Sequence, residues 1–126
     1  MREKITFTYH KLQVWHLAKA LVIEIYKVTN KFPVEERFGL VSQLNRAFVS
    51  VASNIAEGSG RTSRKDQAHF TQLAYGSLME VACQLEIACD LGFIVEKEYL
   101  PIANSIDILS GKFSALRTAQ LRSEIK

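Results

Sequence analysis

Apolar and small residues return every three or four positions in four separate stretches of the chain. This spacing places them on one face of a helix, so each stretch predicts an amphipathic helix packed along its length. The predicted helices span about residues 10–31, 37–58, 63–92 and 97–123. Their apolar stripes are Val14, Ala18, Leu21, Ile25, Val28 and Phe32; Val41, Leu44, Phe48, Val51 and Ile55; Ala74, Leu78, Val81, Leu85 and Ala88; and Ile102, Ile106, Leu109, Phe113 and Leu116.

Residues that interrupt helices separate these stretches. Pro33 cannot continue the first helix, Gly58 and Gly60 end the second, and Gly92 ends the third. Pro101 suits the first turn of the fourth helix. Connections of a few residues force neighbouring helices to run antiparallel, so the fold class predicted is all-α, an up-down-up-down four-helix bundle.

The second predicted helix is apolar over most of its circumference. A helix in an isolated four-helix bundle buries one face, so a second apolar face predicts an interface between copies of the chain. We therefore expect a homo-oligomer. The residues expected at its interface are Leu40, Ala47, Val49, Ala52 and Ala56.

Composition agrees with one domain that spans residues 1–126. The chain is 48% hydrophobic and 23% charged, as in ordinary globular proteins. The first residues have no apolar run after their charges, so a signal sequence is not expected, and no apolar stretch is long enough to cross a bilayer. We expect a cytoplasmic protein that does not contact membranes.

The distribution of charge is more informative than the net charge of +3. Residues 66–95 hold four acids and no Lys or Arg, whereas the preceding stretch is basic. Two interpretations stay open, because adjacent helices of opposite sign attract one another and a basic surface binds nucleic-acid phosphate. The candidate nucleic-acid-binding residues are Arg37, Arg46, Arg61, Arg64 and Lys65.

The turn that begins the third helix contains three of these cations. Ser63 and Asp66 have the spacing of a capping box, in which each side chain binds the backbone of the other residue. Cations in a first turn oppose the helix dipole, so Arg64 and Lys65 contact either a phosphate or only water. The sequence GSGRTSRK matches neither glycine-rich nucleotide-binding pattern, so nucleotide hydrolysis is not expected.

Asp66, Arg64 and His69 are also candidates for metal binding or catalysis. A di-iron site needs two Glu-x-x-His pairs, and Asp66 with His69 is the one comparable pair, so we expect neither a metal nor a cofactor. Arg64 and His69 also resemble the Arg-x(4–6)-His motif of HEPN ribonucleases, in which His acts on the ribose hydroxyl and Arg stabilises phosphate charge. A HEPN-like ribonuclease therefore remains an alternative.

The remaining polar candidates have structural explanations. Cys83 and Cys89 lie six positions apart on one helix and cannot bridge, so buried free thiols are expected. Glu57 and Glu80 are interpreted as hydrogen-bonding or ion-pair residues of the bundle, with Arg46 or Arg37 as partners. Gly76 and Ser77 are expected to allow close helix packing, and His10 and His16 to lie at the surface or cap a helix.

Several motifs in one register resemble a known family between about residues 9 and 94. They are Leu12-x-Val14-Trp15, Phe32-Pro33-x-Glu35-Glu36-Arg37 with Gly39-Leu40, Gln43-x-x-Arg46, Ser50-x-x-x-Asn54-Ile55-Ala56-Glu57-Gly58, and Gly76-Ser77-x-x-Glu80. The chain resembles the bacterial four-helix-bundle family whose first members were encoded in intervening sequences within 23S ribosomal RNA genes.

This resemblance implies a ring, typically a homopentamer, and no enzymatic activity. It also implies a relationship to the accessory proteins of diversity-generating retroelements, which are basic bundles that associate with reverse transcriptase and nucleic acid. The cation-free stretch 66–95 departs from that basic character. We expect a non-enzymatic oligomeric module that binds RNA or a nucleoprotein partner and no small-molecule substrate, with a pure protein-interaction scaffold as a further alternative.

Overall fold

The computed structural model describes residues 5–124. Within this range the chain forms a four-helix bundle without strands. Two short 3-10 turns precede the first and second helices. The elements are η1 (Thr8–Lys11), α1 (Gln13–Thr29), η2 (Val34–Glu36), α2 (Leu40–Ser59), α3 (Arg64–Asp90) and α4 (Glu96–Glu124).

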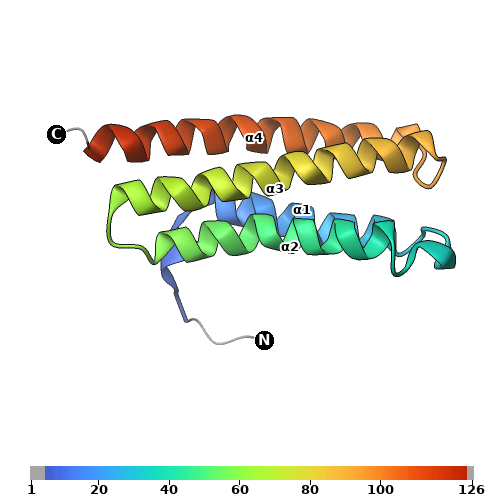
Figure 1. Ribbon diagram of the computed structural model, residues 1–126, viewed down its shortest axis with the longest axis horizontal. Helices are drawn as coiled ribbons and strands as arrows, with labels where there is room; N and C mark the ends of the chain where they lie inside the picture. The colour runs from blue at the N-terminus through green and yellow to red at the C-terminus, as the bar shows by residue number, and fades with distance from the viewer. Residues whose placement is uncertain (1–4, 125–126) are drawn as a thin grey trace.

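The helices run antiparallel in the order up, down, up, down (Figure 1). The start of α1, the α2–α3 turn and the end of α4 share one end of the bundle, which is at the left in Figure 1. We call it the α2–α3 end. Helix α3 packs extensively against both α2 and α4, whereas α1 packs mainly against α2 and less against α4.

The predicted apolar stripes form the core. All members are buried except Val41 and Leu116, which are half-buried and pack against the core. Ile25, Leu78 and Phe113 are completely removed from solvent. The predictions of four helices and of their inward faces are therefore confirmed for the described chain.

The helix ends differ in detail from the prediction. The first predicted helix began at residue 10, but Leu12 has an extended backbone, with φ −98° and ψ 118°, which separates η1 from α1. At the start of α3 the Ser63 hydroxyl accepts a 3.0 Å bond from the backbone N–H of Asp66, as predicted. The reciprocal bond from the Asp66 carboxylate is absent among the described contacts.

The turn after α3 is a Schellman motif. The N–H of Phe93 donates to the carbonyl of Ala88 at 2.9 Å, and the N–H of Gly92 donates to that of Cys89 at 3.0 Å. Gly92 has a φ of +81°, which only glycine adopts without strain. The predicted end of the third helix is thus confirmed.

The predictions for Pro101 and Gly76 are wrong. Pro101 lies inside α4, beyond its first turn, because the helix already begins at Glu96. Gly76 does not mediate close packing: it is exposed, and a Cβ added there would meet nothing within 4 Å. The close approach is instead at Gly58 on α2, where a Cβ would lie 2.8 Å from the Cβ of Phe70 on α3.

Candidate functional site

Exposed cations gather at the α2–α3 end from three parts of the chain. One lies on η1, three lie in the turn and the first residues of α3, and two lie in the last turns of α4. The acids described at this end are Glu57, Asp66 and Glu124, the last residue of α4. We call this surface the basic end; its cations are Lys11, Arg61, Arg64, Lys65, Arg117 and Arg122.

Arg61 is held in place by two contacts. Its Nη2 lies 2.7 Å from Glu57 Oε2, and its guanidinium lies 4.5 Å from the centre of the Phe70 ring. The two charged side chains are 43% and 56% exposed, so this pair stabilises the fold by about 0–1 kcal/mol. Glu57 therefore pairs with Arg61, and not with Arg46 or Arg37 as predicted.

Arg64 belongs to a second set of contacts. Its Nη1 donates to Gln67 Oε1 at 2.9 Å, and Gln67 Nε2 donates to the carbonyl of Arg61 at 2.9 Å. These bonds tie the first turn of α3 to the preceding turn of the chain. They also direct the Arg64 side chain toward a pocket.

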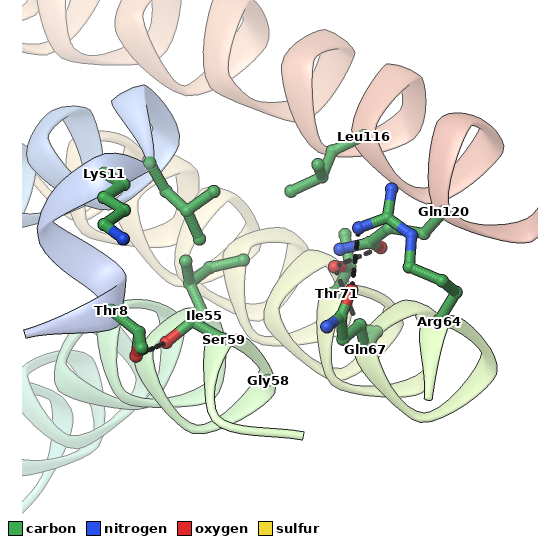
Figure 2. A pocket seen from close by; sticks show the side chains of 11 residues that line it. Thr8, Lys11, Ile55, Gly58, Ser59, Arg64, Gln67, Thr71, Leu116 and Gln120 are labelled. Carbon is green, nitrogen blue, oxygen red and sulfur yellow. Dashed lines mark hydrogen bonds between the residues drawn. The ribbon is translucent and has the colours of Figure 1, made fainter. Parts of the chain in front are cut away.

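The pocket opens between η1 and the ends of α2, α3 and α4 (Figure 2). It has a volume of about 280 Å³. Lys11, Thr8 and Ser59 line one side, and Figure 2 shows Arg64 and Gln120 on the other. The Thr8 and Ser59 hydroxyl oxygens are 2.8 Å apart, a hydrogen bond that fastens η1 to the end of α2. None of the described residues that line the pocket is acidic.

The floor and one wall of this pocket are buried. Leu12, Ile55 and Leu116 supply apolar surface. Thr71 and Gln120 are 3% and 6% exposed, and the Thr71 hydroxyl lies 2.9 Å from Gln120 Oε1. The pocket thus joins an apolar interior to a polar, basic mouth.

The other two candidate cations lie elsewhere. Arg37 precedes α2 and is therefore at the opposite end of a helix about 30 Å long. Arg46 is exposed near the middle of α2. The five candidates therefore do not form one surface. The ion pairs Lys31–Glu98 and Arg61–Glu57 do not join α2 to α3.

Arg64 and His69 do not converge. The two residues are five positions apart on α3, which places them about 140° apart around the helix axis. Their side chains therefore leave α3 on different faces. His69 is exposed, contacts the Phe70 ring edge-to-face at 5.6 Å and does not line the pocket.

Glu80 lies farther along α3 and accepts a 3.2 Å hydrogen bond from Gln84 Nε2. The Oε1 atom of Gln84 is buried without a partner in the described chain.

The thiols are free but are not both buried. Cys83 is exposed, so the prediction of burial is wrong for that residue, and Cys89 is half-buried. Partial burial, with added repulsion from Glu96 and Asp90, raises the pKa of the Cys89 thiol above its ordinary value. His10 serves as a cap, as predicted, because its Nδ1 accepts the backbone N–H of Phe7 at 2.8 Å.

A second surface feature is an apolar groove between α1 and α2, with a volume of about 360 Å³. Three of the predicted interface residues, Val49, Ala52 and Ala56, line it together with Trp15 and Ile23. The exposed fractions of Val49 and Ile23 are 43% and 47%.

The other two predicted interface residues are less accessible. Leu40 is half-buried, and Ala47 is buried in the protomer's own core. This burial arises because α2 is flanked by α1 and α3, so two sides of its circumference face neighbouring helices.

Within residues 5–124, no three His, Cys, Asp or Glu side chains gather where they could hold a metal ion. No described helix combines the length and the apolar character needed to cross a bilayer.

Comparison with known proteins agrees with this architecture. The model of the 23S rRNA-intervening sequence proteins matches residues 10–115, a range that includes most of α4 as well as the motifs of the first three helices. The chain belongs to the family of 23S rRNA-intervening sequence proteins.

A solved structure has the same fold as this member of the 23S rRNA-intervening sequence protein family. It is a protein of unknown function from the S23 ribosomal protein family of Bacteroides thetaiotaomicron VPI-5482, and it superposes with a TM-score of 0.76 at 23% identity over 82% of this chain and 97% of that one. No curated protein matches the chain.

In this family member, sequence reasoning missed Lys11 and Gln120 as parts of the site. Lys11 is far from the basic stretch along the chain, and Gln120 is an ordinary polar residue in the last predicted helix. A glutamine in line with the apolar stripe, seven positions after Phe113, was the available signal.

Proposed function

We propose that this protein is a non-catalytic, self-assembling scaffold that binds RNA, or a partner that contains RNA, through phosphate contacts at the basic end. The observation that supports this most is that Lys11 on η1 and Arg64 on α3 line one pocket, with Arg61 and Lys65 near Arg64 along the chain. Such a cluster attracts phosphate by releasing counterions and does not require base recognition.

The arrangement of Arg64 and His69 supports a binding role over catalysis. General acid–base cleavage of RNA needs both groups within hydrogen-bond reach of one ribose phosphate. Their divergence on α3 opposes this within one protomer. We therefore propose a module without enzymatic turnover.

The groove between α1 and α2 supports self-association. Monomeric proteins rarely leave contiguous apolar surface such as that of Trp15, Ile23 and Val49 open to solvent. Phe38, two residues before α2, is 90% exposed and is a further apolar side chain open to solvent. We propose that copies of the chain cover these surfaces in a ring, with five copies as the family resemblance implies.

Assembly would strengthen RNA binding. Each basic end is a weak phosphate site, but several copies held in one particle engage one RNA with a higher effective concentration. The proposed mechanism therefore needs both surfaces: the groove joins the copies, and the basic ends bind phosphate.

The test is a titration of labelled structured RNA at several salt concentrations, with RNA length followed in the same samples. We expect intact RNA and an affinity that falls linearly with salt on logarithmic axes. Cleavage that is lost in His69→Ala would establish the ribonuclease instead. If the assembled protein does not bind RNA even at low salt, RNA binding is refuted and the alternative of a protein-interaction scaffold is supported.

A further inference from the structure

We propose that the pocket at the α2–α3 end binds a phosphate monoester. A free mononucleotide and the phosphorylated 5′ end of an RNA strand both supply this group. For the RNA end, the inference rests on the proposed function and defines which part of the RNA enters the site. For a mononucleotide, it stands on the pocket alone.

The first reason is a polar side chain in the wall of the pocket. Gln120 is 6% exposed, and its Oε1 accepts from Thr71 at 2.9 Å. The side chain also lines the pocket. The amide N–H groups of Gln120 can therefore donate to a phosphate oxygen bound there.

The second reason is charge. Lys11 and Arg64 stand on different sides of the pocket in Figure 2, and no acid lines it among the described residues. A phosphate monoester carries a charge of about −1.5 to −2 at neutral pH, which two cations balance. The hydroxyls of Thr8 and Ser59 lie beside Lys11 but bind protein oxygens, because Ser59 Oγ donates to the carbonyl of Ala56 and accepts from Thr8.

The third reason is shape. The volume of about 280 Å³ lies just below the range of about 300–1,000 Å³ typical of small-molecule sites. It accommodates a phosphate with part of a sugar. A diester within a strand continues in two directions and would cross the mouth, whereas a terminal monoester can enter with its sugar against the apolar side chains of Leu12, Ile55 and Leu116.

The experiment compares four ligands by fluorescence competition: a short single-stranded RNA with a 5′ phosphate, the same RNA with a 5′ hydroxyl, AMP and adenosine. We expect the 5′ phosphate to improve the affinity of the RNA roughly tenfold, and AMP to compete where adenosine does not. AMP that competes without a preference between the two RNAs assigns the pocket to a free mononucleotide. Equal binding of both RNAs, with no competition by AMP, overturns the inference.

Variants locate the effect. Arg64→Gln and Gln120→Leu should each remove most of the phosphate preference, and Gln120→Leu keeps a side chain of similar size in the buried wall. Lys27→Gln is the matched control, because it removes one exposed cation of α1 outside the pocket and should leave the preference unchanged. Circular dichroism of each variant establishes that the helices are intact.

The proposed function and this inference fail in different ways. If long structured RNA binds with the expected salt dependence but the 5′ phosphate and AMP have no effect, the proposed function stands and the inference fails. If AMP competes and no RNA binds, the pocket stands and RNA binding fails.

Discussion

Gly58 marks the closest approach of α2 and α3, and replacing it with alanine tests that packing directly. The added methyl group would lie 2.8 Å from the Cβ of Phe70 and 3.5 Å from the carbonyl oxygen of Gln67. Real Cβ atoms essentially never come within 3.0 Å of such a neighbour. Both neighbouring atoms are fixed to the α3 backbone, so no rotamer change of Phe70 relieves the contact. The two helices must move apart near the pocket.

Two effects of opposite sign determine the change in stability. Alanine is favoured over glycine inside a helix by up to about 1 kcal/mol. Excess volume in a packed contact costs about 1–3 kcal/mol. Gly76→Ala on α3 is the control, because its methyl group meets nothing within 4 Å and only the favourable effect remains. Gly58→Ala should therefore be less stable than Gly76→Ala by about 1–3 kcal/mol.

The assay is urea unfolding of both variants and the parent, followed by circular dichroism at one protein concentration. A lower midpoint with an unchanged slope means that stability has changed and the denatured state has not. One concentration is needed because assembly links the midpoint to concentration. If Gly58→Ala proves as stable as Gly76→Ala, the close approach of α2 and α3 at this point is wrong.

Three further predictions concern other parts of the chain. Ala52→Glu places a carboxylate in the α1–α2 groove and should reduce the mass measured by light scattering to that of a monomer. The control Asn104→Glu, at an exposed position of α4, should leave that mass unchanged. A parent protein that is already monomeric refutes the assembly surface. The exposed thiol of Cys83 should react with a maleimide before Cys89, whose raised pKa leaves less thiolate at neutral pH. Mass spectrometry of the labelled peptides measures the order of reaction, and faster labelling of Cys89 contradicts this prediction. Gly92→Ala should lower the free energy of unfolding by about 1–2 kcal/mol because the residue has a φ of +81°; an unchanged urea midpoint argues against the Schellman turn.

The fold was predictable because a helix bundle is encoded by local periodicity. Residues such as Leu78 and Leu85 recur at the helical repeat, and each is completely buried. The errors arose where local pattern does not determine the outcome. Gly76 and Gly58 are the same residue type inside helices, and only the position of the neighbouring helix distinguishes an open site from a close contact.

The site was only partly predictable. Arg61, Arg64 and Lys65 are adjacent along the chain, so their grouping follows from the sequence alone. Lys11 and Gln120 join the pocket only because an antiparallel bundle returns η1 and the end of α4 to the same place. Helix register and length set that meeting point, and neither is known from periodicity to better than a turn.

The ion-pair prediction failed for a related reason. Arg61 lies four positions after Glu57, close enough for a pair across the end of α2. Arg46 and Arg37 are farther along the same helix or beyond its start, where no rotamer of Glu57 reaches them. Proximity along the helix was therefore the better guide to this contact.

The central claim is that one end of the bundle binds RNA phosphate, and the salt dependence of RNA binding tests it most directly. One variant neutralises three cations of the basic end: Arg61→Gln, Arg64→Gln and Lys65→Gln. The matched control neutralises three cations near the opposite end: Lys27→Gln, Arg37→Gln and Lys97→Gln. Both variants change the net charge equally. For each copy that engages the RNA, the variant of the basic end should reduce the slope of log affinity against log salt by roughly 2–3. The control variant should leave the slope near the parent value. Equal slopes for the two variants would contradict the claim.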